Sequence, residues 1–297
     1  EIGVRLVGSE MCIRDSMLAY FVSGRALRPL RTFVAQVEKV QPNNLADMKI
    51  TEEVLPEFRQ FSDSFNQMLE RLDEGFTAQR QFTGNAAHEL RTPLALMQAQ
   101  VELFSAEHPD VLPETADFLR LLREQTERMT QMTRTLLEMC GLQAVPCTDH
   151  IELGPMIDEI FADLAPLAEK NNITLEREGD GAMTGSDTLI YRLLFNLTEN
   201  AIKYNRPGGS VRLSVTPEPE KLLIRVSDTG RGIPEHFQRS VFQPFFRVDK
   251  SRSREYGGAG LGLSLVWEIA NLHGGSVWVE ESSEKGTTIA VELPVQG

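Results

Sequence analysis

The 297-residue sequence has few residues of the kinds that mark several specialised classes of protein. Its three cysteines, Cys12, Cys140 and Cys147, lack zinc-ligand spacing, so free thiols in a reducing compartment are the simplest interpretation. Lysine and arginine number 30 against 43 acidic residues, and the resulting net charge of −13 argues against a nucleic-acid partner. Hydrophobic residues (41%) and charged residues (25%) are in ordinary globular proportions, and the length predicts two or three domains.

Long apolar runs are also missing. The apolar run over residues 17–22 has six residues, whereas a membrane-spanning helix needs ~20. Three arginines follow it, which is the positive flank expected on the cytoplasmic side of a span. We therefore interpret residues 17–24 as the remnant of a transmembrane helix and expect a protein of the inner cell membrane with its larger part in the cytoplasm. Residues 1–16 resemble translated sequencing-adapter read-through, and we interpret them as non-native sequence.

Residues 24–75 contain two amphipathic helical patterns joined by a polar connector. Apolar positions recur every three or four residues from Leu27 to Val37 in the first pattern. The second pattern starts near Pro56 and extends to Leu72 with the same spacing. Two short heptad helices directly after a membrane remnant resemble a HAMP linker, which is a parallel four-helix coiled coil. A plain coiled-coil spacer is the alternative.

The second helix is expected to continue through residues 81–93, Q-F-T-G-N-A-A-H-E-L-R-T-P, to about Glu107. A further helix is predicted over 113–140, where the apolar seam alternates strictly between spacings of three and four. Each helix has one apolar seam, and two such helices cannot close a core alone. Residues 76–143 are therefore predicted to form an antiparallel hairpin that dimerises into a four-helix bundle.

His88 lies off the apolar stripe of the first hairpin helix. It is two residues from both Ala86 and Leu90, which places it about 200° round the helix from each and toward solvent. Glu89 follows it, and Thr92 lies one turn further along the exposed face. A carboxylate can hold the proton on one ring nitrogen and leave the other free to attack, so this pattern favours a nucleophile. A solvated histidine on an amphipathic helix is the alternative.

Beyond Pro146 the pattern changes to mixed helix and strand, and residues 148–297 are expected to form a separate domain. The predicted elements are helices over 154–170, 186–204 and 260–272 and strands over 173–177, 211–215, 222–226, 276–281 and 287–293. Strands with one apolar face and three helices to cover it predict a two-layer α/β sandwich. The expected fold class is therefore multidomain, with α-helical segments followed by an α+β domain.

Three stretches of this sandwich favour a nucleotide site. Asn196, Asn200 and Lys203 share one helix edge, and an amide oxygen suits magnesium while a lysine suits phosphate. Asp228 follows Leu222, Ile224 and Val226 at alternate positions, so its carboxylate is expected to point to the same, helix-covered face of the sheet. A buried carboxylate needs a hydrogen-bond donor, and an adenine amino group would supply one. Glycines in D-T-G-R-G-I and G-G-A-G-L-G-L allow close approach of the backbone, and the second string opens a helix suited to polyphosphate. Each stretch alone has an ordinary alternative as a solvated edge or a turn; their joint order favours nucleotide binding.

With these motifs, residues 24–297 resemble a bacterial two-component sensor histidine kinase. H-E-L-R-T-P resembles its phosphoacceptor box, N-L-T-E-N-A-I-K-Y its asparagine box, the two glycine strings its glycine boxes and F-Q-P-F-F-R its phenylalanine box. The resemblance implies a homodimer in which His88 is phosphorylated by ATP with the help of Glu89. It further implies transfer to an aspartate of a response regulator, and dephosphorylation of that regulator by water that Thr92 orients.

The resemblance also assigns the nucleotide site. It implies ATP and Mg²⁺ as cofactors, with Asn200 binding the metal and Asp228 reading adenine. Residues implied on the phosphate side are Asn196, Lys203, Tyr204 and Arg247. The other expected cofactor-binding residues are Gly230, Gly232, Ile233, Gly258, Gly260, Leu261, Gly262, Leu263 and Thr287.

The expected mechanism needs motion, because His88 and the nucleotide residues fall in different predicted domains. Residues 231–258 are expected to act as a lid, and the sandwich to swing on a linker over 142–149. Helix rotation passed down from the linker over 24–75 would permit or prevent docking. Three other functions stay open: a nucleotide-gated dimer without phosphotransfer, an ATPase related to gyrase or heat-shock chaperones, and a kinase that acts mainly as a phosphatase.

Overall fold

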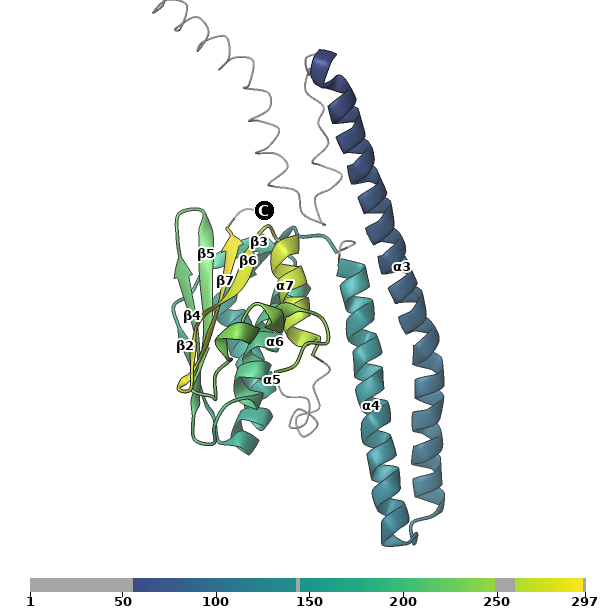
Figure 1. Ribbon diagram of the computed structural model, residues 1–297. Coiled ribbons are helices and arrows are strands. Elements are labelled where there is room, and N and C mark those ends of the chain that lie inside the picture. The colour runs from purple at the N-terminus through teal and green to yellow at the C-terminus, as the bar shows by residue number, and fades with distance from the viewer. Residues whose placement is uncertain (1–55, 143–144, 249–259, 296–297) are drawn as a thin grey trace, which may run out of the picture. The chain divides into compact units, whose positions relative to one another are not determined.

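The computed structural model describes residues 56–142, 145–248 and 260–295 (Figure 1). The predicted membrane remnant, the first linker helix and Gly258 lie outside these residues. Contacts divide the chain into two compact units that meet between Gln79 and Arg80. Across the part of the chain that the structure describes, no helix is long and apolar enough to cross a membrane.

The first described element is the 52-residue helix α3 (Pro56–Glu107). It confirms the prediction that the second linker helix continues into the helix that carries His88. A short turn connects it to α4 (Pro113–Gly141), which begins with a proline at a position where a backbone N–H has no helical partner. The two predicted helices of the hairpin are thus confirmed, with ends within one residue of the expected positions.

The apolar stripe of α3 is only partly covered within one chain. Leu94 and Val101 are buried, with 1% and 7% of their surface exposed. Leu90, Met97 and Phe104, on the same predicted stripe, keep 47%, 42% and 41% exposed. One hairpin therefore leaves much of the predicted seam in contact with solvent, which is the situation that dimerisation would relieve.

The second part of the chain is an α/β domain. Its elements are β1 (Asp149–Glu152), α5 (Leu153–Asn171), β2 (Thr174–Glu178), β3 (Ala182–Gly185), α6 (Asp187–Lys203), β4 (Ser210–Pro217), β5 (Lys221–Asp228), the 3-10 turns η2 (Glu235–Phe237) and η3 (Ser240–Phe242), α7 (Gly262–Leu272), β6 (Ser276–Ser283) and β7 (Gly286–Pro294). Every predicted helix and strand is present. The sequence analysis missed β1 and β3, which are four residues each and pair with one another. It also started α7 two residues early, because Gly260 has a positive φ of 75° and precedes the helix.

The main sheet has five strands in the order β2-β4-β5-β7-β6, in which only β2 and β4 run parallel. The predicted alternation holds, because the inward residues of β4 and β5 are at most 4% exposed: Val211, Leu213, Val215, Leu222, Ile224 and Val226. Helices α5, α6 and α7 cover one face of the sheet (Figure 1). The structure is therefore the predicted two-layer sandwich, with its core between the helices and the sheet.

Candidate nucleotide-binding site

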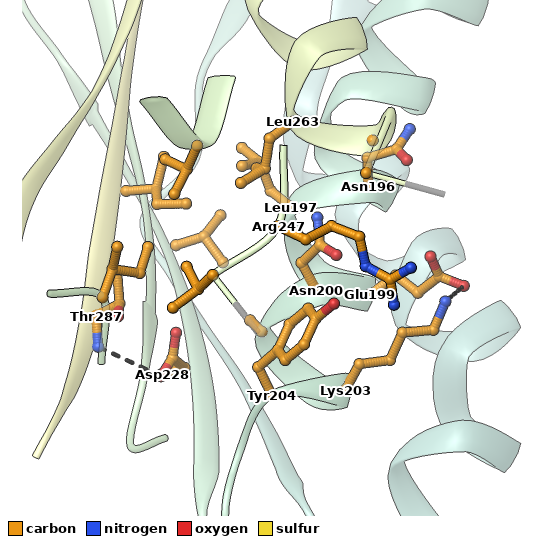
Figure 2. Close-up of a pocket in the computed structure, with 18 of the residues that line it drawn as sticks. Asn196, Leu197, Glu199, Asn200, Lys203, Tyr204, Asp228, Arg247, Leu263 and Thr287 are labelled. Carbon is orange, nitrogen blue, oxygen red and sulfur yellow. Dashed lines mark hydrogen bonds and ion pairs between the residues drawn. The ribbon is translucent and has the colours of Figure 1, made fainter. Parts of the chain in front are cut away.

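A cavity of about 500 Å³ lies where α6, the end of β5, the segment after it and the start of α7 meet (Figure 2). It is lined by these residues predicted from the sequence: Asn196, Asn200, Lys203, Tyr204, Asp228, Gly232, Ile233, Arg247, Gly260, Leu261, Gly262, Leu263 and Thr287. Gly230 lies behind this lining, and Gly258 is outside the described residues. Segments that are almost 100 residues apart in sequence thus contribute to one cavity.

One end of the cavity is built around the Asp228 carboxylate at the end of β5. Its Oδ1 accepts hydrogen bonds from the backbone N–H of Gly230 at 2.7 Å and of Thr287 at 3.3 Å. Burial raises the pKa of the Asp228 carboxyl above its ordinary value, although these two hydrogen bonds act in the opposite direction. Both bonds go to the same oxygen, so the other oxygen can accept a hydrogen bond from a ligand.

Gly230 supports this carboxylate by leaving space. A Cβ atom at position 230 would lie 2.5 Å from the Tyr204 carbonyl oxygen and 2.8 Å from Asp228 Oδ1. No larger residue fits there without moving the backbone. Glycine at position 230 therefore allows the backbone to lie close enough to donate its N–H to the Asp228 carboxylate. The prediction grouped Gly230 with ligand-binding residues, whereas the structure places it as a support for one of them.

The walls next to Asp228 are apolar. Val226, Leu197 and Leu261 are at most 3% exposed, and Val241 and Ile289 are 7% and 9% exposed. Apolar walls together with one buried carboxylate suit a purine base, which is apolar on its faces and carries hydrogen-bonding groups on its edge. The sequence analysis named Leu261 but missed the other four, because alternating apolar residues in strands and helices read as ordinary core.

The opposite end of the cavity is polar and is built on α6. Asn196 Nδ2 donates to the Arg192 carbonyl at 2.7 Å, which fixes the amide so that its Oδ1 lies 3.0 Å from where a Cβ of Gly262 would be. Asn200 and Lys203 follow one and two turns later. Figure 2 shows Asn200 and Lys203 pointing into the same space as the Arg247 side chain. Amide oxygens beside two cations suit a metal-bound polyphosphate.

Glu199 also lines this polar end and was not predicted there. Its Oε1 lies 2.8 Å from Lys203 Nζ, one helical turn away, and the two side chains are 29% and 24% exposed. Its position beside Asn200 within the N-L-T-E-N string was a signal that the sequence analysis did not use.

His88, Glu89 and Thr92 lie on α3, and none of them lines the cavity. All three are exposed, as the helical phase predicted for His88. The structure therefore gathers the predicted nucleotide residues in the sandwich and keeps the predicted nucleophile on the helical hairpin.

The fold and the cavity define a class: an ATPase-type two-layer sandwich that follows a helical hairpin with an exposed histidine. Two family models match, "Histidine kinase-, DNA gyrase B-, and HSP90-like ATPase" over residues 185–297 and "His Kinase A (phospho-acceptor) domain" over residues 78–140. The second match separates this chain from the gyrase and chaperone ATPases. The chain belongs to the sensor histidine kinases of two-component systems.

Individual relatives agree with that assignment. The sensor protein CutS of Streptomyces coelicolor is 30% identical over 283 residues, which are 93% of this chain and 67% of CutS. The sensor protein IrlS of Burkholderia pseudomallei is 30% identical over 287 residues, which are 95% of this chain and 61% of IrlS. The chain thus spans about half to two thirds of the length of such relatives, the sensor histidine kinase RppB of Synechocystis being covered to 50%.

A solved structure shows the same fold. Full-length ShkA in complex with AMPPNP superposes with a TM-score of 0.58 at 20% sequence identity, covering 72% of this chain and 45% of that one.

Proposed function

We propose that this chain is the kinase portion of a homodimeric, membrane-anchored sensor that autophosphorylates His88 with ATP. The phosphoryl group then passes to an aspartate of a separate response regulator, which the same protein also dephosphorylates. The observation that carries the proposal is that one chain joins an exposed His88–Glu89 pair to a cavity with a carboxylate at its apolar end and Asn200 beside Lys203 at its polar end.

The cavity residues fit ATP with Mg²⁺. The free oxygen of Asp228 would accept the adenine amino group, and the buried walls would hold the ring out of water. Asn200 would bind the metal, and Lys203 and Arg247 would neutralise phosphate charge. The bound Mg²⁺ supplies charge stabilisation where the γ-phosphoryl group leaves.

His88 then acts as the nucleophile. A bond forms between a ring nitrogen and the γ-phosphorus while the bond from that phosphorus to the β–γ bridging oxygen breaks, leaving ADP. Glu89 would accept the proton from the other ring nitrogen and keep the attacking nitrogen unprotonated. The protein's contribution is mainly positioning, so the sandwich must reach His88 by moving on the linker over 142–149.

Dimerisation is supported by the exposed part of the hairpin seam. Leu90, Met97 and Phe104 of α3 and Leu122 and Met129 of α4 are all more than a third exposed. A second hairpin packed on this seam would bury these side chains in a four-helix bundle. Membrane anchoring rests on the apolar remnant over residues 17–24 and its arginine flank.

The test is phosphate labelling of the chain with γ-labelled ATP and Mg²⁺. Wild type is expected to acquire acid-labile, base-stable label, and His88→Gln and Asn200→Ala are expected to lose it. His108→Gln is the matched control, because His108 is another exposed histidine of the hairpin; it stacks on Phe104, and its Nδ1 lies 3.2 Å from the Phe104 carbonyl oxygen. Label retained by His88→Gln, or phosphate released without any labelled protein, would overturn the proposal in favour of another nucleophile or an ATPase.

A further inference from the structure

Glu199 is a carboxylate at the phosphate end of the cavity, where a negative charge is unexpected. Among the described residues that line the cavity, Glu199 and Asp228 are the acidic ones, and Asp228 belongs to the apolar end. Glu199 extends from α6 beside Asn200 and contacts Lys203 Nζ at 2.8 Å. Figure 2 shows its carboxylate beside the Lys203 amine and near the Arg247 guanidinium.

Lys203 offsets the charge of Glu199 in the nucleotide-free protein. When a polyphosphate binds, the same carboxylate repels it, because like charges a few ångströms apart repel. A divalent cation bound to the carboxylate and to the phosphates would turn that repulsion into attraction. Mg²⁺ at phosphate sites is usually held by one or two carboxylates together with the substrate phosphates. Asn200 offers only a neutral amide, so Glu199 is the carboxylate among the described lining residues at this end that can complete such a site.

Three side chains that carry oxygens line this end of the cavity from α6: Asn196, Glu199 and Asn200. Asn196 is the helical neighbour of both others, with Glu199 at i+3 and Asn200 at i+4. Asn196 is fixed by its bond to Arg192, and Glu199 is held through Oε1 by Lys203. A carboxylate has two oxygens, so one can accept from Lys203 while the other binds a metal or a metal-bound water.

We propose that Glu199 is the carboxylate ligand of the nucleotide-bound Mg²⁺, beside Asn200, and that its other oxygen positions Lys203 toward the phosphates. This inference rests on the proposed function, because it requires that the cavity bind ATP with magnesium. The ion pair with Lys203 would then arrange the phosphate end of the cavity rather than stabilise the fold, since a partly exposed pair contributes little to stability.

The test measures how much Mg²⁺ tightens nucleotide binding. Binding of a fluorescent ATP analogue to the full chain is titrated in excess EDTA and in saturating Mg²⁺. Glu199→Gln, which keeps the shape but removes the charge, is expected to lose on the order of tenfold or more of the Mg²⁺-dependent gain. Its affinity in EDTA should be equal to wild type or higher, because a repulsive charge has been removed. Glu176→Gln is the matched control, since Glu176 pairs with Arg212 on the exposed surface of β2 and β4.

A direct metal readout accompanies this titration. With a non-hydrolysable ATP analogue present, the free Mn²⁺ signal in electron paramagnetic resonance should rise for Glu199→Gln and for Asn200→Ala, but not for Glu176→Gln. Thermal unfolding without nucleotide checks that the variants fold, and the partly exposed position of Glu199 favours that result.

Two results would overturn the inference. One is a Mg²⁺-dependent gain in Glu199→Gln equal to that of wild type. The other is an equal loss of affinity in EDTA and in Mg²⁺, as expected of Lys203→Met, because Glu199 would then act only through Lys203. A wild-type chain that binds no nucleotide, or binds it without regard to Mg²⁺, would instead contradict the proposed function itself.

Discussion

Asp228 has to satisfy two opposing requirements. Burial raises the pKa of its carboxyl, so the ionised form is disfavoured in the fold, yet the adenine contact that we propose needs a strong acceptor there. Because the folded pKa of Asp228 is raised, this group stabilises the fold fully below its unfolded pKa of 3.8. That contribution is lost as the pH rises through the folded pKa. At neutral pH the charge is therefore held for binding and not for stability.

Replacing Asp228 by Asn should separate these requirements. The amide oxygen can still accept from Gly230 and Thr287, so the nucleotide-free variant should unfold at the same temperature as wild type or higher at pH 7. ATP affinity should fall roughly ten- to hundredfold, because a hydrogen bond to a charged acceptor contributes about 1.5–3 kcal/mol. Calorimetric titration and thermal unfolding measure the two effects. Unchanged ATP affinity would mean that Asp228 does not bind the base.

His273 is a buried histidine to which the sequence assigned no role. Its Nε2 accepts from the Ser186 backbone N–H at 3.0 Å, and its Nδ1–H donates to the Ile269 carbonyl at 2.9 Å. It thereby connects the end of α7 to the start of α6, the two helices whose other parts line the cavity. The bond from Ser186 requires the neutral ring, because a protonated Nε2 cannot accept. Burial lowers the pKa of the His273 imidazole, although its bond to the Ile269 carbonyl acts in the opposite direction.

This arrangement predicts acid sensitivity. Because the folded pKa of His273 is depressed, its contribution to stability is fully present above the unfolded value of 6.5 and is lost as the pH falls from there toward the folded value. The free energy of unfolding should fall by up to about 1.4 kcal/mol per pH unit across that window. A carboxylate also lies near Ser186: Asp149 Oδ2 accepts a hydrogen bond from the backbone N–H of Asp187 at 3.2 Å.

Urea unfolding at several pH values between 5 and 7.5 measures this effect. His273→Gln should be less stable than wild type at pH 7.5 but should show a flatter pH dependence below 6.5. His150→Gln, on the exposed strand β1, is the matched control and should keep the wild-type slope. A slope that is the same in His273→Gln and wild type would assign the acid sensitivity to other groups.

At the scale of elements, the start of α7 depends on one backbone conformation. Gly260 has a φ of 75°, and a Cβ there would lie 2.7 Å from the Phe246 carbonyl oxygen. The Gly260 carbonyl also accepts from the Phe245 N–H at 2.9 Å, which joins the segment after β5 to the helix start. The N-terminal N–H groups of α7 face the polar end of the cavity only if this turn is kept.

Gly260→Ala should therefore weaken both stability and binding. The left-handed conformation alone costs an alanine roughly 1–2 kcal/mol, and the clash with Phe246 should displace the turn and lower ATP affinity several-fold. Gly274→Ala is the matched control, because Gly274 has a φ of 70° at the other end of α7, and a Cβ there would meet only Pro294 Cγ, at an unstrained 3.9 Å. It should lose similar stability and no affinity. Equal affinity in both variants would show that the turn does not shape the site.

The elements also show what sequence patterns can and cannot provide. Long periodic segments such as α6 and β5 were predicted correctly, because burial repeats many times along each of them. The strands β1 and β3 were missed because four residues show too little alternation, and their pairing is a tertiary contact. The cavity was predicted through its glycines, its polar residues and three apolar residues next to the glycines. Its other apolar walls and Glu199 were not predicted, since Val241 and Ile289 look like any core residue.

At the scale of the whole molecule, the continuity of α3 connects the predicted linker with the proposed phosphoacceptor. The helix runs from Pro56 to Glu107 and carries His88 early in its second half. Because residues of an α-helix are related by about 100°, a rotation imposed at one end changes the direction in which His88 faces. Such a rotation is a physical means by which a membrane signal would permit or prevent docking of the sandwich.

Inserting one residue after Gly75 should therefore change the basal rate of autophosphorylation by several-fold. Gly75 is an exposed position, and nothing lies within 4 Å of a Cβ built there. One residue turns His88 by about 100° relative to the preceding segment, whereas seven residues restore the phase to within about 20°. The seven-residue insertion is thus the matched control, and it should return the rate toward wild type. Both rates are measured with γ-labelled ATP on samples whose dimeric state has been verified by light scattering. Equal rates in the one-residue variant and wild type would show that helix phase does not carry the signal, and they would favour control through the linker between α4 and the sandwich.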